Sequence, residues 1–142
     1  MNIIIQALAM MFMKTALHEL PYLENWRWLS RRIRCALEPD EPRVIDHYLA
    51  EGRYLVCCTD TSAWTVALTS FRLLLDTACD RMLPWHWRCI CLDQAWRPLL
   101  QLRTLDRREH NDRWQPYATQ LATCVLLPSI SSDELMQGHD DE

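Results

Sequence analysis

Residues 64–82 constrain the fold of this chain more than any other part of its sequence. Apolar side chains recur there at steps of three and four residues, namely Trp64, Ala67, Leu68, Phe71, Leu74, Leu75, Ala78, Cys79 and Met82. Steps of that size place the side chains along one side of an α-helix. Asp60, Thr61 and Ser62 can cap its first turn, and Pro84 has no N–H with which to continue it. The pattern predicts a central helix over residues 62–82.

The period of the apolar pattern changes from 3.6 to two after this helix. In residues 85–92 the alternating positions are Trp85, Trp87, Cys89 and Cys91. An extended strand puts such positions on one face. A second run over residues 96–104 predicts the partner strand of a hairpin, and Pro98 places that strand at a sheet edge. Residues 54–59 are apolar enough for a further strand. The sequence therefore predicts an α+β fold with a short, mainly antiparallel sheet packed against the central helix.

The first part of the chain has helical patterns that are interrupted by prolines. We predict a helix over residues 3–20 that stops at Pro21 and a second helix over residues 24–37. A short helix over residues 43–51 is expected to close at Gly52, because glycine adopts the left-handed cap conformation readily. The N-terminal half is therefore expected to be helical.

Length and charge define the domain organisation. The chain has 142 residues, enough for a single globular domain, which we assign to residues 1–128. Residues 129–142 carry acidic groups without a basic counterpart, and we expect a mobile acidic tail there. The net charge of −4 does not attract the protein to nucleic acid, and two glycines are too few for a phosphate-cradling loop. A segment that mixes helix and strand signals precedes the tail, and it favours a helix over residues 117–125.

Seven cysteines, an odd number, are scattered along the chain without the spacing of a small secreted scaffold. This distribution predicts a reducing, cytoplasmic location. The apolar run over residues 3–13 is too short to span a bilayer, so no membrane span is expected. A first helix with this composition would need to be covered, and a homodimer is one way to cover it.

A segment rich in arginine and tryptophan is the leading candidate for a binding surface. Its members are Trp26, Arg27, Trp28, Arg31, Arg32 and Arg34. Guanidinium groups on a helix can contact phosphates while tryptophan stacks on bases, or they can bind an acidic protein surface. A solvated helix face packed through its tryptophan side is the plain structural alternative. Protein binding is favoured over nucleic acid because the rest of the charge is negative.

Two kinds of chemistry are weighed for the thiols. Cys89 and Cys91 near His86 are soft metal ligands, but no second close-spaced pair completes a zinc site. The alternation places both sulfurs in the core, so we predict no metal and no cofactor. A catalytic cysteine could use His47, His86 or His110, although no local signature marks any thiol as a nucleophile. No catalytic residue is therefore assigned.

The sequence leaves enzymatic activity open and favours its absence. The predicted function is that of a small intracellular protein-binding or regulatory domain of bacterial type, such as an adaptor, inhibitor, immunity protein or secretion chaperone. It would act through the surface of arginine and tryptophan on a partner that is another, acidic protein. The first alternative is a nucleic-acid-associated regulator that uses the same arginines. The second is a cysteine-dependent enzyme.

Overall fold

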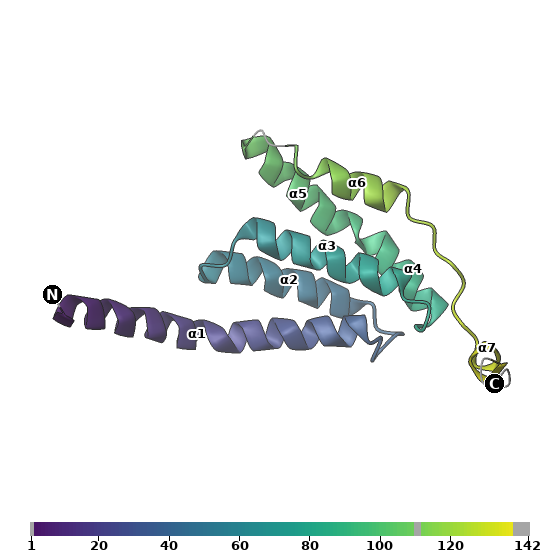
Figure 1. Cartoon of the computed structure of the whole chain (residues 1–142), viewed down its shortest axis with the longest axis horizontal. Helices are drawn as coiled ribbons and strands as arrows, with labels where there is room; N and C mark the ends of the chain where they lie inside the picture. The colour runs from purple at the N-terminus through teal and green to yellow at the C-terminus, as the bar shows by residue number, and fades with distance from the viewer. Residues whose placement is uncertain (1, 110–111, 138–142) are drawn as a thin grey trace.

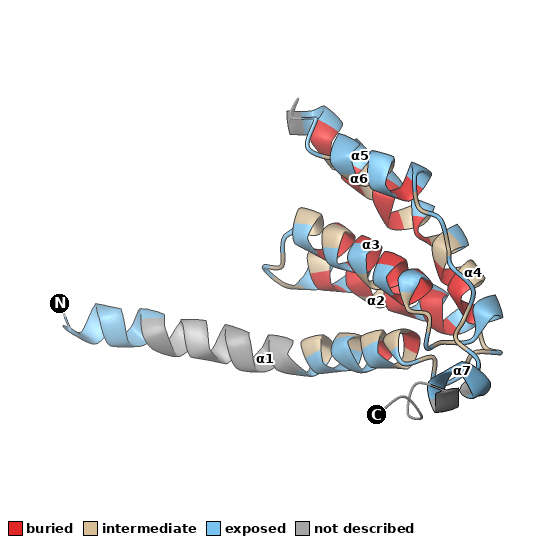
Figure 2. Cartoon of the chain, turned by 45° about the vertical axis from the view of Figure 1, so that its right-hand side comes forward, coloured by how far each residue is buried: buried red, intermediate tan, exposed pale blue. Residues whose placement is uncertain are grey.

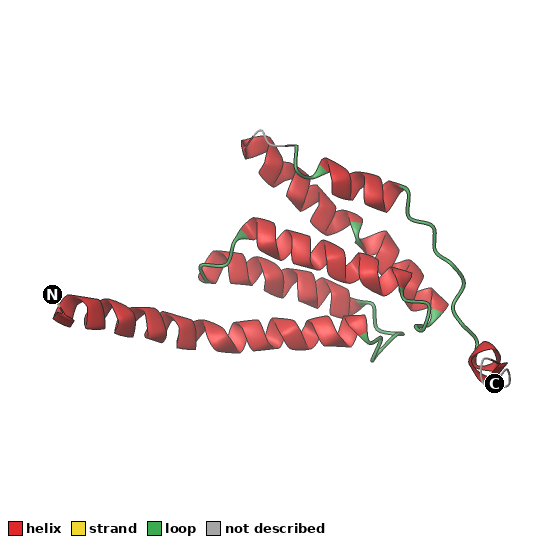
Figure 3. Ribbon diagram, in the orientation of Figure 1, coloured by secondary structure: helices red, strands yellow, loops and turns green. Residues whose placement is uncertain are grey.

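The computed structural model describes residues 2–109 and 112–137, and these form α-helices joined by short loops (Figure 3). In chain order the helices are α1 (Asn2–Arg34), α2 (Arg43–Cys58), α3 (Ala63–Cys79), α4 (Trp85–Gln94), α5 (Trp96–Glu109), α6 (Gln115–Ala122) and α7 (Ser132–Gln137). The described part of the chain contains no β-strand. The predicted α+β fold with its antiparallel sheet is therefore wrong.

The helix α3 lies at the centre of the bundle. It contacts α1 and α2 on one side and α4 and α5 on the other, and α6 packs on α5 (Figure 1). Phe71, Leu74 and Ala78 on α3 have no exposed surface. α3 occupies most of the range in which the apolar pattern predicts a helix, and Ser62 caps it by accepting a hydrogen bond from the backbone N–H of Thr65. The layered arrangement follows because α3 is apolar over most of its circumference and needs neighbours on several sides.

The hairpin predicted over residues 85–92 and 96–104 is replaced by two helices, α4 and α5. The buried positions with hydrophobic side chains are Trp87, Cys91, Ala95, Leu99 and Leu102. Their spacing of four, four, four and three residues is helical, whereas Trp85 is 48% exposed although it belongs to the alternating set. A window of eight residues could not distinguish the two periods. Pro98 fits because it lies in the first turn of α5, where backbone N–H groups lack helical acceptors.

The strand predicted over residues 54–59 is also wrong, because α2 continues to Cys58. Its buried positions are Val44, Ile45, Tyr48, Leu49, Gly52 and Leu55, a helical stripe that runs past Gly52. Gly52 is therefore inside the helix and does not cap it. A Cβ at this position would lie 3.0 Å from Cγ1 of Val66 and 3.3 Å from Nε1 of Trp26. Glycine allows α2 to approach both α3 and α1 closely.

Residues 2–34 form one helix, and the break predicted at Pro21 does not occur. Pro21 lies inside α1 on an exposed position. The helix ends beyond Arg34, where Ala36 adopts a left-handed conformation with φ 48°. The N–H of Leu37 then bonds to the carbonyl of Arg32 at 3.1 Å, which is the hydrogen bond of a Schellman motif. Packing of the second half of α1 on α2 and α3 offsets the hydrogen bond that Pro21 removes.

A buried carboxylate connects the last helices of the bundle. Asp106 is 2% exposed, and its Oδ2 accepts a short hydrogen bond from the backbone N–H of Trp114, just before α6. The helix α6 begins two residues before the predicted range 117–125 and ends three residues earlier than it. Residues 124–131 then follow without helical structure, and we refer to them as the strap. Of the predicted tail, residues 132–137 form α7, and residues 138–142 lie outside the described part.

Candidate functional site

The segment of arginine and tryptophan lies in the second half of α1, and its members point in different directions. Trp26 faces the core. Its ring stacks on Tyr48 with the centroids 5.1 Å apart, and its Nε1–H donates to the carbonyl oxygen of Tyr48 at 3.2 Å. Trp26 therefore fixes α1 to α2 and is not available to a partner.

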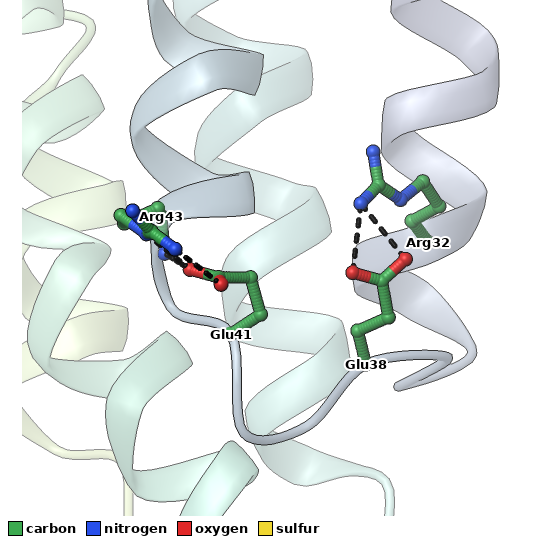
Figure 4. A network of polar contacts seen from close by, with 4 residues as sticks. All are labelled: Arg32, Glu38, Glu41 and Arg43. Atoms are coloured by element: carbon green, nitrogen blue, oxygen red, sulfur yellow. Dashed lines mark hydrogen bonds and ion pairs between the residues drawn. The ribbon is translucent and has the colours of Figure 1, made fainter.

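Two of the four arginines are engaged in ion pairs. Arg32 donates to both carboxylate oxygens of Glu38 at 2.9 Å, as Figure 4 shows beside the pair formed by Glu41 and Arg43. Arg34 donates to Asp80 at 2.6 Å. These contacts stabilise the turn after α1 and the end of α3. Both arginines therefore have a structural role that the sequence did not predict.

The remaining three residues form an open surface, which we call the outer face of α1: Arg27, Trp28 and Arg31. Trp28 is 52% exposed, and both arginines are exposed. Within the described residues neither guanidinium group has a hydrogen bond or ion pair. Arg27 and Arg31 are one turn apart, and Trp28 lies beside them on the side of α1 opposite Trp26, Leu29 and Ile33. The structure thus keeps three of the six predicted residues together on one surface.

The first turns of α1 carry apolar side chains that the bundle does not cover. Ile3, Ile4, Ile5 and Leu8 are 80%, 67%, 63% and 59% exposed, and we call them the apolar end of α1. Figure 2 shows this end of the helix projecting away from the other helices. The side chains of residues 9–20 are not described. Among the described residues, no helix combines the length and the apolar character needed to cross a bilayer.

A groove between α2, α3 and α5 is a second open surface. It has a volume of about 410 Å³ and is lined mainly by apolar side chains, including Leu49, Val56, Val66 and Leu105. The exposed residues Arg53 and Arg108 also line it. Sequence reasoning missed this groove because parts of two of its walls, the end of α2 and most of α5, were predicted as strands. The only signal was the apolar stripe of α2 and α5 exceeding what one neighbouring helix covers.

The residues considered for metal binding and catalysis are not brought together. His86 lies 3.3 Å from Asp40, and Cys91 is buried elsewhere on α4, where burial raises the pKa of its thiol to about 12. His47 pairs with Glu51 at 3.6 Å, and His110 lies outside the described residues. The described part of the chain holds no group of three or more histidine, cysteine, aspartate or glutamate side chains arranged to bind a metal ion.

No protein-family model, no curated protein and no solved structure matches the chain. The surfaces described above are therefore the basis for assigning a function.

Proposed function

We propose that this chain is a small non-enzymatic domain that binds another protein through the outer face of α1. The observation that carries the proposal is the half-exposed indole of Trp28 beside two arginines, Arg27 and Arg31, for which the described residues provide no acceptor. Tryptophan and arginine are the residue types that contribute most often to binding energy at protein interfaces. An adaptor, an inhibitor, an immunity protein or a secretion chaperone would use a surface of this kind.

The chemistry of the outer face defines the partner. Arg27 and Arg31 are spaced by one helical turn, and guanidinium groups bind carboxylates through paired hydrogen bonds. The indole of Trp28 supplies apolar area beside them. The partner should therefore present acidic side chains around an apolar patch, and a protein surface does so more readily than a nucleic acid.

The apolar end of α1 supports association with a second copy of the chain. Ile3, Ile4 and Ile5 are consecutive, and successive residues of a helix point about 100° apart. A single flat surface cannot cover three such side chains, whereas packing among several helices can. Homodimerisation that packs this end of α1 against more than one helix of the second copy would bury them and leave the outer face free in the second half of the helix.

The groove between α2, α3 and α5 is compatible with the same class of function. Its apolar floor and its two arginines, Arg53 and Arg108, suit an amphipathic helix with acidic residues. The groove is the alternative binding site for the partner, and crosslinking distinguishes it from the outer face of α1.

A nucleic-acid partner is the competing function for the same arginines. Only Arg27 and Arg31 of the four remain open for phosphate, and the net charge of the chain is −4. Affinity for nucleic acid would fall steeply with salt because counterions are released. An interface centred on Trp28 would depend less on salt.

We place the protein in a reducing, cytoplasmic compartment. All seven cysteines are free thiols, and four of them, Cys35, Cys57, Cys58 and Cys79, are exposed. Exposed thiols persist where small-molecule thiols keep them reduced.

Site-specific photo-crosslinking tests the proposal. A photo-reactive amino acid is introduced at Cys35, which is exposed one turn after Arg31, and in separate variants at Leu100 in the groove and at Gln120 on α6. Position 35 should give a discrete adduct with a protein in the native cell, and position 120 should give none.

The double substitution Arg27→Ala and Arg31→Ala is the first control and should abolish the adduct from position 35. The matched control, Arg43→Ala with Arg107→Ala, removes the same charge from other exposed positions and should leave the adduct unchanged. A discrete adduct from position 100 alone would move the site to the groove and contradict the proposal for α1. An adduct that nuclease removes would favour nucleic acid.

A further inference from the structure

Cys79 and Cys124 lie side by side although they are far apart in the sequence. Their sulfur atoms are 3.7 Å apart. Cys79 is the last residue of α3, and Cys124 is the first residue of the strap, after α6. The fold therefore brings together two thiols from segments that are separated by the whole of α4, α5 and α6.

We propose that Cys79 and Cys124 are a reversible disulfide site, oxidised by exchange with a small-molecule disulfide such as oxidised glutathione. A disulfide bond is about 2.05 Å long, so the sulfurs must approach each other by less than 2 Å. Cys124 can make this movement because it belongs to a non-helical segment. Cys79 is exposed, so a small molecule can reach it.

The exchange proceeds in two balanced steps. The thiolate of one cysteine attacks a sulfur of oxidised glutathione, the S–S bond of that molecule breaks, and one glutathione thiolate leaves and takes up a proton. The thiolate of the second cysteine then attacks the protein sulfur of the mixed disulfide and releases the second glutathione. The two protein sulfurs lose two electrons, and two glutathione molecules carry them away as thiols.

The disulfide would fix the beginning of the strap, whose second half is already held by hydrogen bonds. Arg81 bonds the strap twice, through its Nε–H to the carbonyl of Pro128 and through its carbonyl to the N–H of Ile130, both at 2.9 Å. Ser129 donates to the carbonyl of Leu83 at 2.7 Å and accepts from the buried Arg88 at 3.0 Å. A covalent bond at Cys124 would attach the strap to the end of α3 at its beginning, in addition to the contacts that residues 128–130 make with Arg81, Leu83 and Arg88.

The environment of Cys79 determines how fast this exchange occurs. Partial burial of the sulfur, together with the hydrogen bond shared with Cys124, raises the pKa of Cys79 to about 11. Because the thiolate is the attacking species, exchange that begins at Cys79 is slow at neutral pH and accelerates as the pH rises. The equilibrium between dithiol and disulfide depends on the geometry of the pair and is measured independently of the rate.

The test is an equilibrium in buffers of reduced and oxidised glutathione at mildly alkaline pH. After acid quenching and alkylation, peptide mapping of the wild-type chain should show the peptide of Cys79 linked to that of Cys124 in the monomer, with Cys35 alkylated or glutathionylated. Reduction should reverse the linkage. The oxidised chain should also unfold at a higher temperature than the reduced one, because the bond closes a long loop, and the N–H of Ile130 should exchange more slowly with solvent.

Single substitutions give the controls. Cys79→Ser and Cys124→Ser should each eliminate the linkage and leave the other cysteine as a mixed disulfide with glutathione, while Cys35→Ser should retain the linkage. The wild-type peptide map decides the matter even if a variant folds poorly. Glutathione on both Cys79 and Cys124 of the wild-type chain, or alkylation of both in oxidising buffer, would overturn the proposal.

Discussion

Arg34, in the last turn of α1, donates a hydrogen bond from Nη1 to Oδ2 of Asp80, 2.6 Å away. Asp80 follows α3 directly, and its Oδ1 accepts from the backbone N–H of Met82 at 3.0 Å. One carboxylate therefore joins the end of α1 to the turn between α3 and α4. The hydrogen bond from Arg34 has the largest effect on Asp80 and lowers its pKa. Partial burial raises this pKa by a smaller amount, and the backbone N–H of Met82 lowers it further.

The first prediction concerns Asp80→Asn. Because the pKa of Asp80 is lowered in the folded chain, its charged form stabilises the fold above the ordinary aspartate pKa of about 4, and this contribution is lost as the pH falls below that value. Arg34 is 43% exposed, so screening limits the effect at pH 7 to about 1 kcal/mol. Urea unfolding at several pH values measures it. A difference between variant and wild type that stays constant down to pH 2 would contradict the assignment.

The second prediction concerns the close approach at Gly52. Gly52→Val should lower the free energy of unfolding by about 2–3 kcal/mol, because the added carbons meet Val66 and Trp26. Ala50→Val, on the exposed side of the same helix, is the matched control and should cost only about 0.5 kcal/mol through helix propensity. Chemical denaturation of both variants measures the two losses. Equal losses would show that the interface at Gly52 is looser than described.

The third prediction concerns Trp87, which has no exposed surface and donates from Nε1 to the carbonyl of Ile33 at 3.0 Å. Trp87→Phe should destabilise the fold by about 2 kcal/mol, because it removes a buried hydrogen bond and leaves space in the core. The surface residue Trp96, which is 48% exposed, provides the comparison. Thermal unfolding of Trp96→Phe should match the wild type. A tolerated Trp87→Phe would argue against the contact between α4 and α1.

The fourth prediction ranks the thiols by reactivity. Burial raises the pKa of Cys91 to about 12, so Cys91 should be alkylated more slowly at pH 7 than any exposed cysteine. Cys35, Cys57 and Cys58 should be labelled first because they are exposed, whereas Cys79 is exposed but its pKa is raised to about 11. Alkylation followed by peptide mapping over time gives the order. One thiol that reacts far faster than all the others would instead support the cysteine-dependent enzyme.

The fifth prediction concerns the apolar end of α1. If a second copy covers this end, the wild-type chain should sediment as a dimer at micromolar concentrations, and Ile4→Glu should shift it toward monomer. A charge at this position would have to be buried at the contact between the copies. Leu100→Glu, which places a charge on a side chain that is 54% exposed in the groove, is the control and should leave the dimer intact. A monomeric wild-type chain would contradict self-association.

Sequence reasoning located the helical N-terminal half and the central helix, and it failed where a short window was ambiguous. Trp87 and Cys91 satisfy a period of two and a period of four equally well, and only the continuation through Ala95, Leu99 and Leu102 separates them. Pro21 predicted a helix end because local propensity takes no account of packing between helices. A longer window would have reduced the first error but not the second.

The candidate site was predicted in part for a similar reason. Periodicity placed Trp26 and Arg31 on the same helix, but the partners that engage Trp26 and Arg34 are Tyr48 and Asp80, 22 and 46 residues away. Such contacts depend on tertiary structure and leave no local signal. The proximity of Cys79 and Cys124 left no signal in the sequence for the same reason.

The most direct test of binding through α1 uses the partner protein that crosslinks to position 35. The equilibrium affinity of this partner is measured for two matched tryptophan variants of the chain. Trp28→Ala should weaken binding by about 30-fold, as expected for an interface tryptophan that contributes about 2 kcal/mol. Trp96→Ala, which removes an indole of similar exposure from α5, should leave the affinity unchanged. Equal effects of the two substitutions, or none from Trp28→Ala, would contradict the proposed function of the outer face.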